Sequence, residues 1–280
     1  MNKYKLMNIL SLTFAYILLV MFSISIILPV LWIVMSSFQP GDSLFTTSFV
    51  PDFRNLTIRH YIALFDTRYP IWFMNSLKVA VINMVLAVTI TSLTAYGFSR
   101  FKFKGKRITM VSILVLQMFP SFLAMVAIYI LLNMLGLLNS HAGLLLVYVS
   151  GQIPYNTWLV KGFLDGIPKT LDEAARVDGA NDFVIFYRII MPLAKPVLVL
   201  VAITNFMAPW FDFIFPRIIL RSPEKYTLAI GIFRWVQENV GDRFTQFAAG
   251  AILVAVPITI LFAYLQKHIA EGLSAGAVKG

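Results

Sequence analysis

The sequence predicts an all-α polytopic membrane protein. Of its 280 residues, 59% are hydrophobic and only 13% are charged, whereas soluble domains average roughly 25% charged residues. The apolar residues also gather in uncharged runs long enough to cross a bilayer as helices, which takes about 20 residues each. The net charge of +10 is explained by basic loops, which membrane insertion requires, so we expect no nucleic-acid partner.

Six membrane-spanning helices can be placed along the chain. They cover approximately 12–35, 79–99, two segments within 108–160, 196–215 and 244–266. The uncharged stretch 108–160 must hold two helices, because a single helix of that length would reach about 80 Å. The polar hairpin 137–143 divides it. The N-terminal apolar run is too long for a signal peptide and is followed by no small-residue cleavage site, so we expect this first helix to be retained.

An even number of spans places both termini on one side of the membrane. That side includes the loop 100–107, in which five of eight residues are basic, and short basic loops stay in the cytoplasm. We therefore expect cytoplasmic termini and a cytoplasmic loop 165–195. The chain then divides into a first helix with an outer loop (1–71) and a core of five helices (72–280) that ends in the tail 268–280.

The cytoplasmic loop is predicted to hold two short helices joined by a bend. Thr170 and Glu173 have the spacing of a capping box, in which each side chain caps the start of the helix. Gly179 stands where a helix often ends in a left-handed residue, Asn181 can cap the second helix, and Pro192 is expected to end it. Local chemistry also allows an amphipathic connector on the membrane surface, with Glu173 acting only as a cap.

The motif Glu173–Gly179, followed by Ile189–Pro192, resembles the loop by which permease subunits of ATP-binding-cassette importers hold their ATPase. The resemblance implies the type I importer permease fold, with the first helix docked in a cleft of the ATPase. The residues that it assigns to docking are Glu173, Ala174, Ala175, Asp178, Gly179 and Pro192. Many members have leucine before the proline; Met191 stands there in this chain and preserves volume and apolarity.

The C-terminal third resembles the smaller permease subunit of maltose and maltodextrin importers, most clearly in the ending Gly272–Gly280. In that branch the tail reaches the interface between two ATPase copies, which assigns this role to Ser274, Ala275, Gly276 and Lys279. Its small residues are not expected to form a stable element alone, so a frayed terminus is the alternative. An outer loop probes the sugar site of the binding protein, which assigns that role to Trp235, Gln237, Glu238 and Asn239. The same side chains also suit any exposed outer loop.

Polar residues within the predicted spans are candidates for the translocation path. They are Asn83, Thr91, Gln117, Ser121, Gln152, Asn156, Thr204 and Asn205. We favour Gln152, Asn156 and Asn205, because the segment 151–154 is expected to break or kink its span and broken helices line cavities. Single polar residues in spans more often hold helices together. Asp212, at the outer end of the fifth span, is predicted to be an interfacial or gate residue.

We expect no catalytic residue, metal site or cofactor in this chain. It has no cysteine, its three histidines are too scattered for a zinc cluster, and no phosphate-binding loop occurs. The resemblance implies that ATP and Mg are bound by two partner ATPase subunits, and that a second permease subunit and an extracytoplasmic sugar-binding protein complete the assembly in the cell membrane of a prokaryote.

The expected function is that of a permease subunit in an ATP-driven importer of oligosaccharides, with maltose or maltodextrin as the favoured cargo. One alternative is an importer permease for another sugar, a polyol or glycerol phosphate. An ion-coupled secondary transporter is disfavoured, because such carriers keep ionisable residues in mid-membrane and these spans have none there. A membrane anchor with no transport role is a third possibility.

Overall fold

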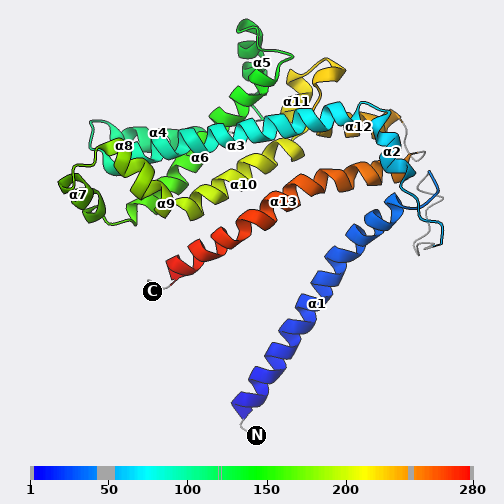
Figure 1. Ribbon diagram of the computed structural model, residues 1–280, viewed down its shortest axis with the longest axis horizontal. Helices are drawn as coiled ribbons and strands as arrows, with labels where there is room; N and C mark the ends of the chain where they lie inside the picture. The colour runs from blue at the N-terminus through cyan, green and yellow to red at the C-terminus, as the bar shows by residue number, and fades with distance from the viewer. Residues whose placement is uncertain (1–2, 43–53, 119, 121, 239–242, 278–280) are drawn as a thin grey trace. The chain divides into compact units, whose positions relative to one another are not determined.

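The computed structural model describes residues 3–42, 54–118, 120, 122–238 and 243–277, and in this part of the chain all regular structure is helical (Figure 1). The helices are α1 Lys3–Ser37, α2 Arg59–Phe65, α3 Tyr69–Arg100, α4 Lys106–Gln117, α5 Met125–Met134, α6 His141–Asp165, α7 Thr170–Val177, α8 Asp182–Val184, a π-helix Ile185–Ile190, α9 Met191–Leu193, α10 Lys195–Phe211, α11 Ile214–Ile219, a 3-10 helix Pro223–Lys225, α12 Leu228–Glu238 and α13 Phe244–Ala277. The all-α prediction is confirmed.

The chain forms two compact units. Unit 1 consists of Met1–Thr67 with Arg234–Leu253, and unit 2 of Arg68–Phe233 with Val254–Gly280. Each unit therefore combines segments that lie far apart in the sequence, and α12 and α13 each contribute to both.

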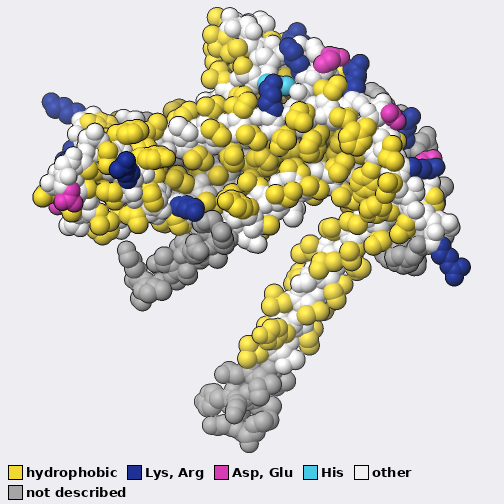
Figure 2. Space-filling view, in the orientation of Figure 1, with side chains coloured by type: hydrophobic (Ala, Val, Ile, Leu, Met, Phe, Trp, Pro, Cys, Tyr) yellow, Lys and Arg dark blue, Asp and Glu magenta, His cyan; other side chains and the backbone are white. Residues whose placement is uncertain are grey.

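Helix α1 is the most exposed apolar element of unit 1. Its 35 residues correspond to a length of about 50 Å, and every side chain from Ser11 to Leu31 is exposed. Figure 2 shows hydrophobic side chains along this helix. A helix that is apolar on every face needs an apolar environment, so α1 has the character of the predicted first span.

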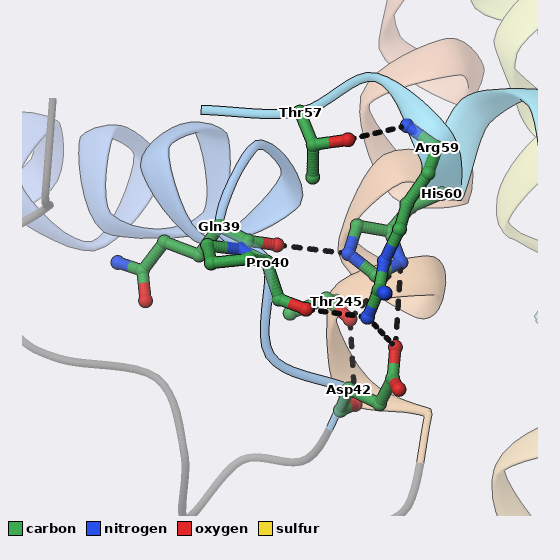
Figure 3. A network of polar contacts seen from close by, with 7 residues as sticks. All are labelled: Gln39, Pro40, Asp42, Thr57, Arg59, His60 and Thr245. Carbon is green, nitrogen blue, oxygen red and sulfur yellow. Dashed lines mark hydrogen bonds and ion pairs between the residues drawn. The ribbon is translucent and has the colours of Figure 1, made fainter. Parts of the chain in front are cut away.

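A network of polar contacts lies in unit 1 where α1 ends (Figure 3). Arg59 contacts the Asp42 carboxylate at 2.6 Å and also donates to the carbonyl of Pro40. The buried His60 ring bonds the carbonyl of Gln39 through Nε2 at 2.8 Å, and its Nδ1 lies 3.4 Å from the hydroxyl of Thr245. Because Thr245 belongs to the start of α13, the network joins the segment after α1 to α2 and α13.

Three long helices, α3, α6 and α10, pack together in unit 2. Ala80, Ala87 and Ala95 of α3 are fully buried, and small residues let membrane helices approach closely. Two apolar clusters fill the spaces beside them. One includes Tyr96, Val160, Leu164, Ile185, Ile190 and Val197, and the other includes Val79, Leu132, Leu144, Ile219 and Ile230.

Within the described residues, three helices are long and apolar enough to cross a membrane: Ser11–Ser37, Tyr69–Arg100 and Phe244–Gln266. The pair Asp182–Leu193 and Lys195–Phe211 passes the same test together, although it is bent by 78°. The hairpin that was predicted at 137–143 is confirmed, since α5 ends at Met134 and α6 begins at His141. The six-span count stays a prediction.

The predicted membrane span before that hairpin is interrupted, and this interruption was not predicted from the sequence. Helix α4 ends at Gln117 and α5 begins at Met125. Pro120 lies in the interval; proline has no N–H for a helical hydrogen bond and disfavours helical geometry in the residue before it. The first half of the stretch 108–160 is therefore two shorter helices.

A break or kink was predicted at 151–154; the break is wrong, because α6 is helical through Pro154, and the kink stays a prediction. Proline leaves a carbonyl of the preceding turn without its usual partner, yet such helices persist when neighbours satisfy the freed groups. The carbonyl of Gly151 accepts a hydrogen bond from the Gln117 side chain at 2.9 Å. Helices α3 and α10 also pack against α6, so tertiary packing overrides the local signal.

Candidate functional site

The bend predicted at Gly179 is confirmed. Gly179 has a φ of +85°, which is left-handed geometry that glycine adopts without strain. Its N–H donates to the carbonyl of Arg176 at 3.0 Å, and the N–H of Ala180 donates to that of Ala175 at 2.9 Å. These two bonds form a Schellman motif, which ends α7 and turns the chain toward α8.

The predicted capping box is wrong. The helix begins one residue earlier, with Lys169 as N-cap and no side-chain cap, and the N–H of Glu173 donates to the carbonyl of Lys169 at 3.1 Å. Pro168 precedes this start, and its carbonyl accepts from Leu171 at 3.3 Å. The Glu173 side chain is exposed and makes no hydrogen bond or ion pair within the described part of the chain, so its carboxylate can meet a partner.

The second helix of the loop is partly as predicted. Asn181 caps it, since its side-chain oxygen accepts the N–H of Val184 at 2.9 Å. Pro192 does not end it, however: the chain passes from α8 through the π-helix into α9, which contains Pro192. In the wider π turn the N–H of Met191 bonds the carbonyl of Phe186, so the helical path continues in altered register. The chain turns only after Ala194, where α10 begins.

A buried ion pair holds α7 against the end of α3. Nε of Arg100 lies 2.6 Å from a carboxylate oxygen of Asp172, and the two side chains are only 4% and 10% exposed. The contact lies off the direction of the N–H bond, so it is an ion pair without a well-aligned hydrogen bond. Arg100 also donates to the carbonyls of Leu164 and Ile167 at 3.1 and 3.2 Å. One guanidinium therefore links α3, the end of α6 and α7.

A second polar contact joins the same ends of α3 and α6. Ser99 donates to Asp165 at 2.8 Å, and Lys161 contacts the other carboxylate oxygen at 2.5 Å. Burial raises the pKa of Asp165, but the hydrogen bonds from Lys161 and Ser99 outweigh burial and leave that pKa below its usual value. Neither contact was predicted from the sequence. Arg100 was treated only as a basic residue of the loop 100–107, and its partner Asp172 lies 72 residues away.

Most of the predicted docking residues are exposed on this loop. Exposed residues are Glu173, Ala174, Asp178, Gly179 and Pro192, and Val177, which the motif did not include, is 89% exposed. Ala175 is different, because it is buried in the apolar cluster of the chain's own core. It supports α7 from inside, and Ala174 alone of the two presents its methyl group outward.

Two other predicted regions differ from expectation. Trp235, Gln237 and Glu238 belong to α12 instead of a loop, and Trp235 is only 9% exposed, so its ring is not presented to a sugar. Asn239 lies outside the described residues. In the tail, Ser274, Ala275 and Gly276 continue the long helix α13, which ends at Ala277, so the prediction that these residues form no stable element alone stays untested. Lys279 lies outside the described residues.

The predicted path residues meet at the centre of unit 2. Asn83 of α3 donates to the carbonyl of Asn205 at 2.7 Å and to the side chain of Gln152 at 3.2 Å. Asn156 donates to the side chain of Asn205 at 3.3 Å. These amides join α3, α6 and α10, as polar side chains in membrane helices often do. Gln152, Asn156 and Asn205 also line an open hollow of about 310 Å³ together with Tyr155.

A neighbouring hollow of about 460 Å³ shares Gly151 and Gln152 with the first. The hydroxyl of Tyr148 donates to a carboxylate oxygen of Asp212 at 2.8 Å, and both residues line this space. The other oxygen of Asp212 accepts the N–H of Ile214 at 2.9 Å and caps the start of α11. The two hollows, which meet at Gly151 and Gln152 of α6, are lined by amide, phenol and carboxylate groups among apolar side chains.

Comparison with known proteins decides the family. The family model described as "Binding-protein-dependent transport system inner membrane component" matches residues 84–274, more than half of the chain. The chain belongs to this family of transport permeases. The assignment confirms the resemblance that the loop 165–195 and the C-terminal third indicated.

Several permeases of this family are similar over nearly their whole length. The galactooligosaccharides transport system permease protein GanQ of Bacillus subtilis (strain 168) is 42% identical over 99% of this chain and 98% of its own. The maltodextrin transport system permease protein MdxG of the same strain is 42% identical over 95% of both chains. The maltose/maltodextrin transport system permease protein MalG of Escherichia coli (strain K12) is 34% identical, again over 95% of both.

A solved permease shares the fold. A chain in a crystal structure of a bacterial ABC transporter that imports the acidic polysaccharide alginate aligns over 95% of this chain and 98% of its own. The TM-score is 0.79 and the sequence identity 21%, so this likeness concerns the fold alone. Together with the family match, it confirms the permease fold.

Proposed function

We propose that this chain is one of two permease subunits in an ATP-driven, binding-protein-dependent importer of oligosaccharides. The observation that carries the proposal is α7, an exposed short helix fastened to α3 and α6 by the buried pair Arg100–Asp172. A partner that moves α7 therefore pulls on two of the three long helices of unit 2. In this assembly six spans leave both termini and the loop 165–195 in the cytoplasm of a prokaryotic cell.

The coupling follows from how α7 is held. Two ATPase subunits, which bind ATP and Mg, grip Glu173 and Ala174, and the tail around Ser274–Gly276 lies against their interface. When the ATPases close, the movement of α7 passes through Arg100 to the end of α3. The 78° bend before α10 provides a second route, by which movement of the loop is passed to α10. Alternating access needs such a two-state element, and ATP biases its balance.

The sugar path runs along α6 through the two hollows that share Gln152. Sugar hydroxyl groups need hydrogen-bond partners, and the amides of Gln152 and Asn156 and the Tyr148–Asp212 pair supply donors and acceptors there. Asn205 serves both as a helix link and as part of the lining. A second permease subunit closes the open side of these hollows. A sugar-binding protein delivers the cargo, and Gln237, which is exposed on α12, is a candidate contact for it.

Maltodextrin is the favoured cargo, because the ending Gly272–Gly280 is typical of that branch and relatives such as MdxG carry that function in their names. Galactooligosaccharides are the second candidate, since GanQ is equally similar and aligns over 99% of the chain. Both are short neutral sugars.

The test is reconstitution of the complex that co-purifies with this chain. In liposomes, we expect ATPase activity that a binding protein loaded with the correct sugar stimulates, and uptake of labelled maltodextrin that depends on ATP. Uptake of galactooligosaccharides in its place would select the second candidate. Sugar uptake driven by an ion gradient without ATP would refute the proposal.

The docking role of α7 has its own test. Glu173→Lys should weaken ATPase association at least tenfold in a pull-down assay, while the amount of inserted permease stays unchanged. Glu224→Lys is the control, because Glu224 is also exposed and lies near the other end of α3, where its carbonyl contacts Asn75 and its carboxylate forms a surface ion pair with Arg68 at 3.2 Å. Equal loss of association in both variants, or none in Glu173→Lys, would remove the assigned role.

A further inference from the structure

A hollow of about 600 Å³ lies beside the start of α4, between α4 and α6. Three basic side chains line it, those of Lys106, Arg107 and Lys161, together with the apolar side chains of Ile108 and Val111. The coupling loop and the sugar path described above do not use this hollow. Its lining changes from cationic to apolar over about one turn of α4.

The positive charge of the hollow is only partly neutralised. Lys161 is paired with Asp165, and Lys106 donates to the carbonyl of Phe101 at 3.1 Å. Arg107 is exposed and has no carboxylate within ion-pair distance among the described residues. Burial lowers the pKa of Lys106, and the neighbouring ammonium groups of Lys161 and Lys169 lower it further, while Asp165 opposes them. An anion placed here would relieve this repulsion.

The apolar part of the hollow is exposed. Ile108 and Val111 are both exposed, and the half-buried ring of Trp158 lies beside them, with its Nε1 donating to the carbonyl of Met110 at 2.9 Å. Tryptophan is enriched where membrane helices meet the headgroup layer. A soluble anion would leave these apolar groups uncovered, whereas a molecule with both a phosphate and an acyl chain would cover them.

We propose that this hollow binds one anionic phospholipid, with its phosphate at Lys106 and Arg107 and the upper part of an acyl chain against Ile108, Val111 and Trp158. Charge complementarity selects an anionic headgroup, because each basic residue near such a membrane surface contributes about fivefold to binding. The chain belongs to an inner-membrane family, and the proposal places the start of α4 at the bilayer surface. The proposal does not depend on the transported sugar.

The experiment measures lipid binding by native mass spectrometry of the full chain, purified with its co-purifying subunits. Phosphatidylglycerol and phosphatidylcholine with identical acyl chains are the probes. We expect one phosphatidylglycerol per chain to persist through delipidation, and binding at least tenfold weaker in Lys106→Gln/Arg107→Gln. The matched control is Lys102→Gln/Lys104→Gln, which removes the same charge from exposed residues that do not line the hollow, and which should bind phosphatidylglycerol like the unmodified chain.

A third variant distinguishes loss of the lipid site from loss of folding. Val111→Trp keeps every charge but fills the apolar part of the hollow, so it should also lose the bound lipid. Equal weakening in the Lys102/Lys104 control, equal retention of phosphatidylcholine, or displacement by millimolar inorganic phosphate would each overturn the proposal.

Cross-linking distinguishes a lipid from a protein occupant. The chain has no cysteine, so Val111→Cys can carry a single photoreactive label in the membrane. We expect the label to capture phosphatidylglycerol. Capture of another subunit would show that protein covers the hollow and would also overturn the proposal.

Discussion

The ion pairs Arg100–Asp172 and Arg59–Asp42 have the same 2.6 Å contact but opposite surroundings. The first has side chains that are 4% and 10% exposed, and the second has side chains that are 53% and 66% exposed. Removing one partner of a buried pair leaves an uncompensated charge in a medium of low polarity, whereas water solvates the survivor of an exposed pair. Burial, and not distance, therefore makes the α7 anchor the more sensitive of the two.

Breaking the buried pair should have the largest effect. Asp172→Ala leaves Arg100 buried without its counter-charge, which costs about 3–5 kcal/mol. We expect a clear fall in the Tm of the purified permease and loss of ATP-driven transport. Thermal unfolding in detergent measures the first effect, and uptake by liposomes measures the second.

A double substitution sharpens the same test. Arg100→Met/Asp172→Leu removes both charges and retains bulk, and such replacements are often neutral or stabilising. It should recover most of the lost Tm. If the double variant is as unstable as Asp172→Ala, desolvation of the charge is not the reason for the loss.

The bend at Gly179 tests whether α7 depends on backbone geometry as well as on the ion pair. Gly179→Ala places a side chain at a φ of +85°, which costs about 1–2 kcal/mol. The matched control is Gly162→Ala in α6, where an added Cβ meets no atom within 4 Å and the helix should gain about 0.5–1 kcal/mol. Opposite shifts in Tm are expected, and a loss in both variants would contradict this account of the bend.

The exposed pair should matter least at ordinary salt concentration. Asp42→Asn is expected to change the free energy of unfolding by at most about 1 kcal/mol, and the change should shrink as salt is added. Denaturation at 0.05 and 0.5 M salt measures it. A loss as large as that of Asp172→Ala would reverse the ranking drawn from burial.

Asp165 provides an intermediate, pH-dependent case near the buried pair. Its pKa lies below its usual value in the folded chain, so the stability that it contributes is complete above the unfolded pKa of about 3.9 and is lost as pH falls through the folded pKa. Below about pH 4, the unmodified chain should lose more stability than Asp165→Asn, by less than about 1 kcal/mol since the carboxylate is partly solvated. Parallel pH profiles of the two proteins would exclude this contribution.

The sequence by itself determined that the protein is apolar and all-helical, and it located the hairpin at 137–143, the bend at Gly179 and the cap at Asn181. Each of these depends on hydropathy or on contacts within a few residues, which a linear pattern records. The family resemblance had the same origin, since the spacing from Glu173 to Pro192 is local.

Only the tertiary structure decided the rest. Pro154 and Pro192 remain helical because packing and an altered hydrogen-bond register replace what proline removes. Ala175 faces the core because segments distant in sequence cover it. The pair Arg100–Asp172 forms because α3 and α7 meet at the end of α6, and no pattern of neighbouring residues records a contact across 72 positions.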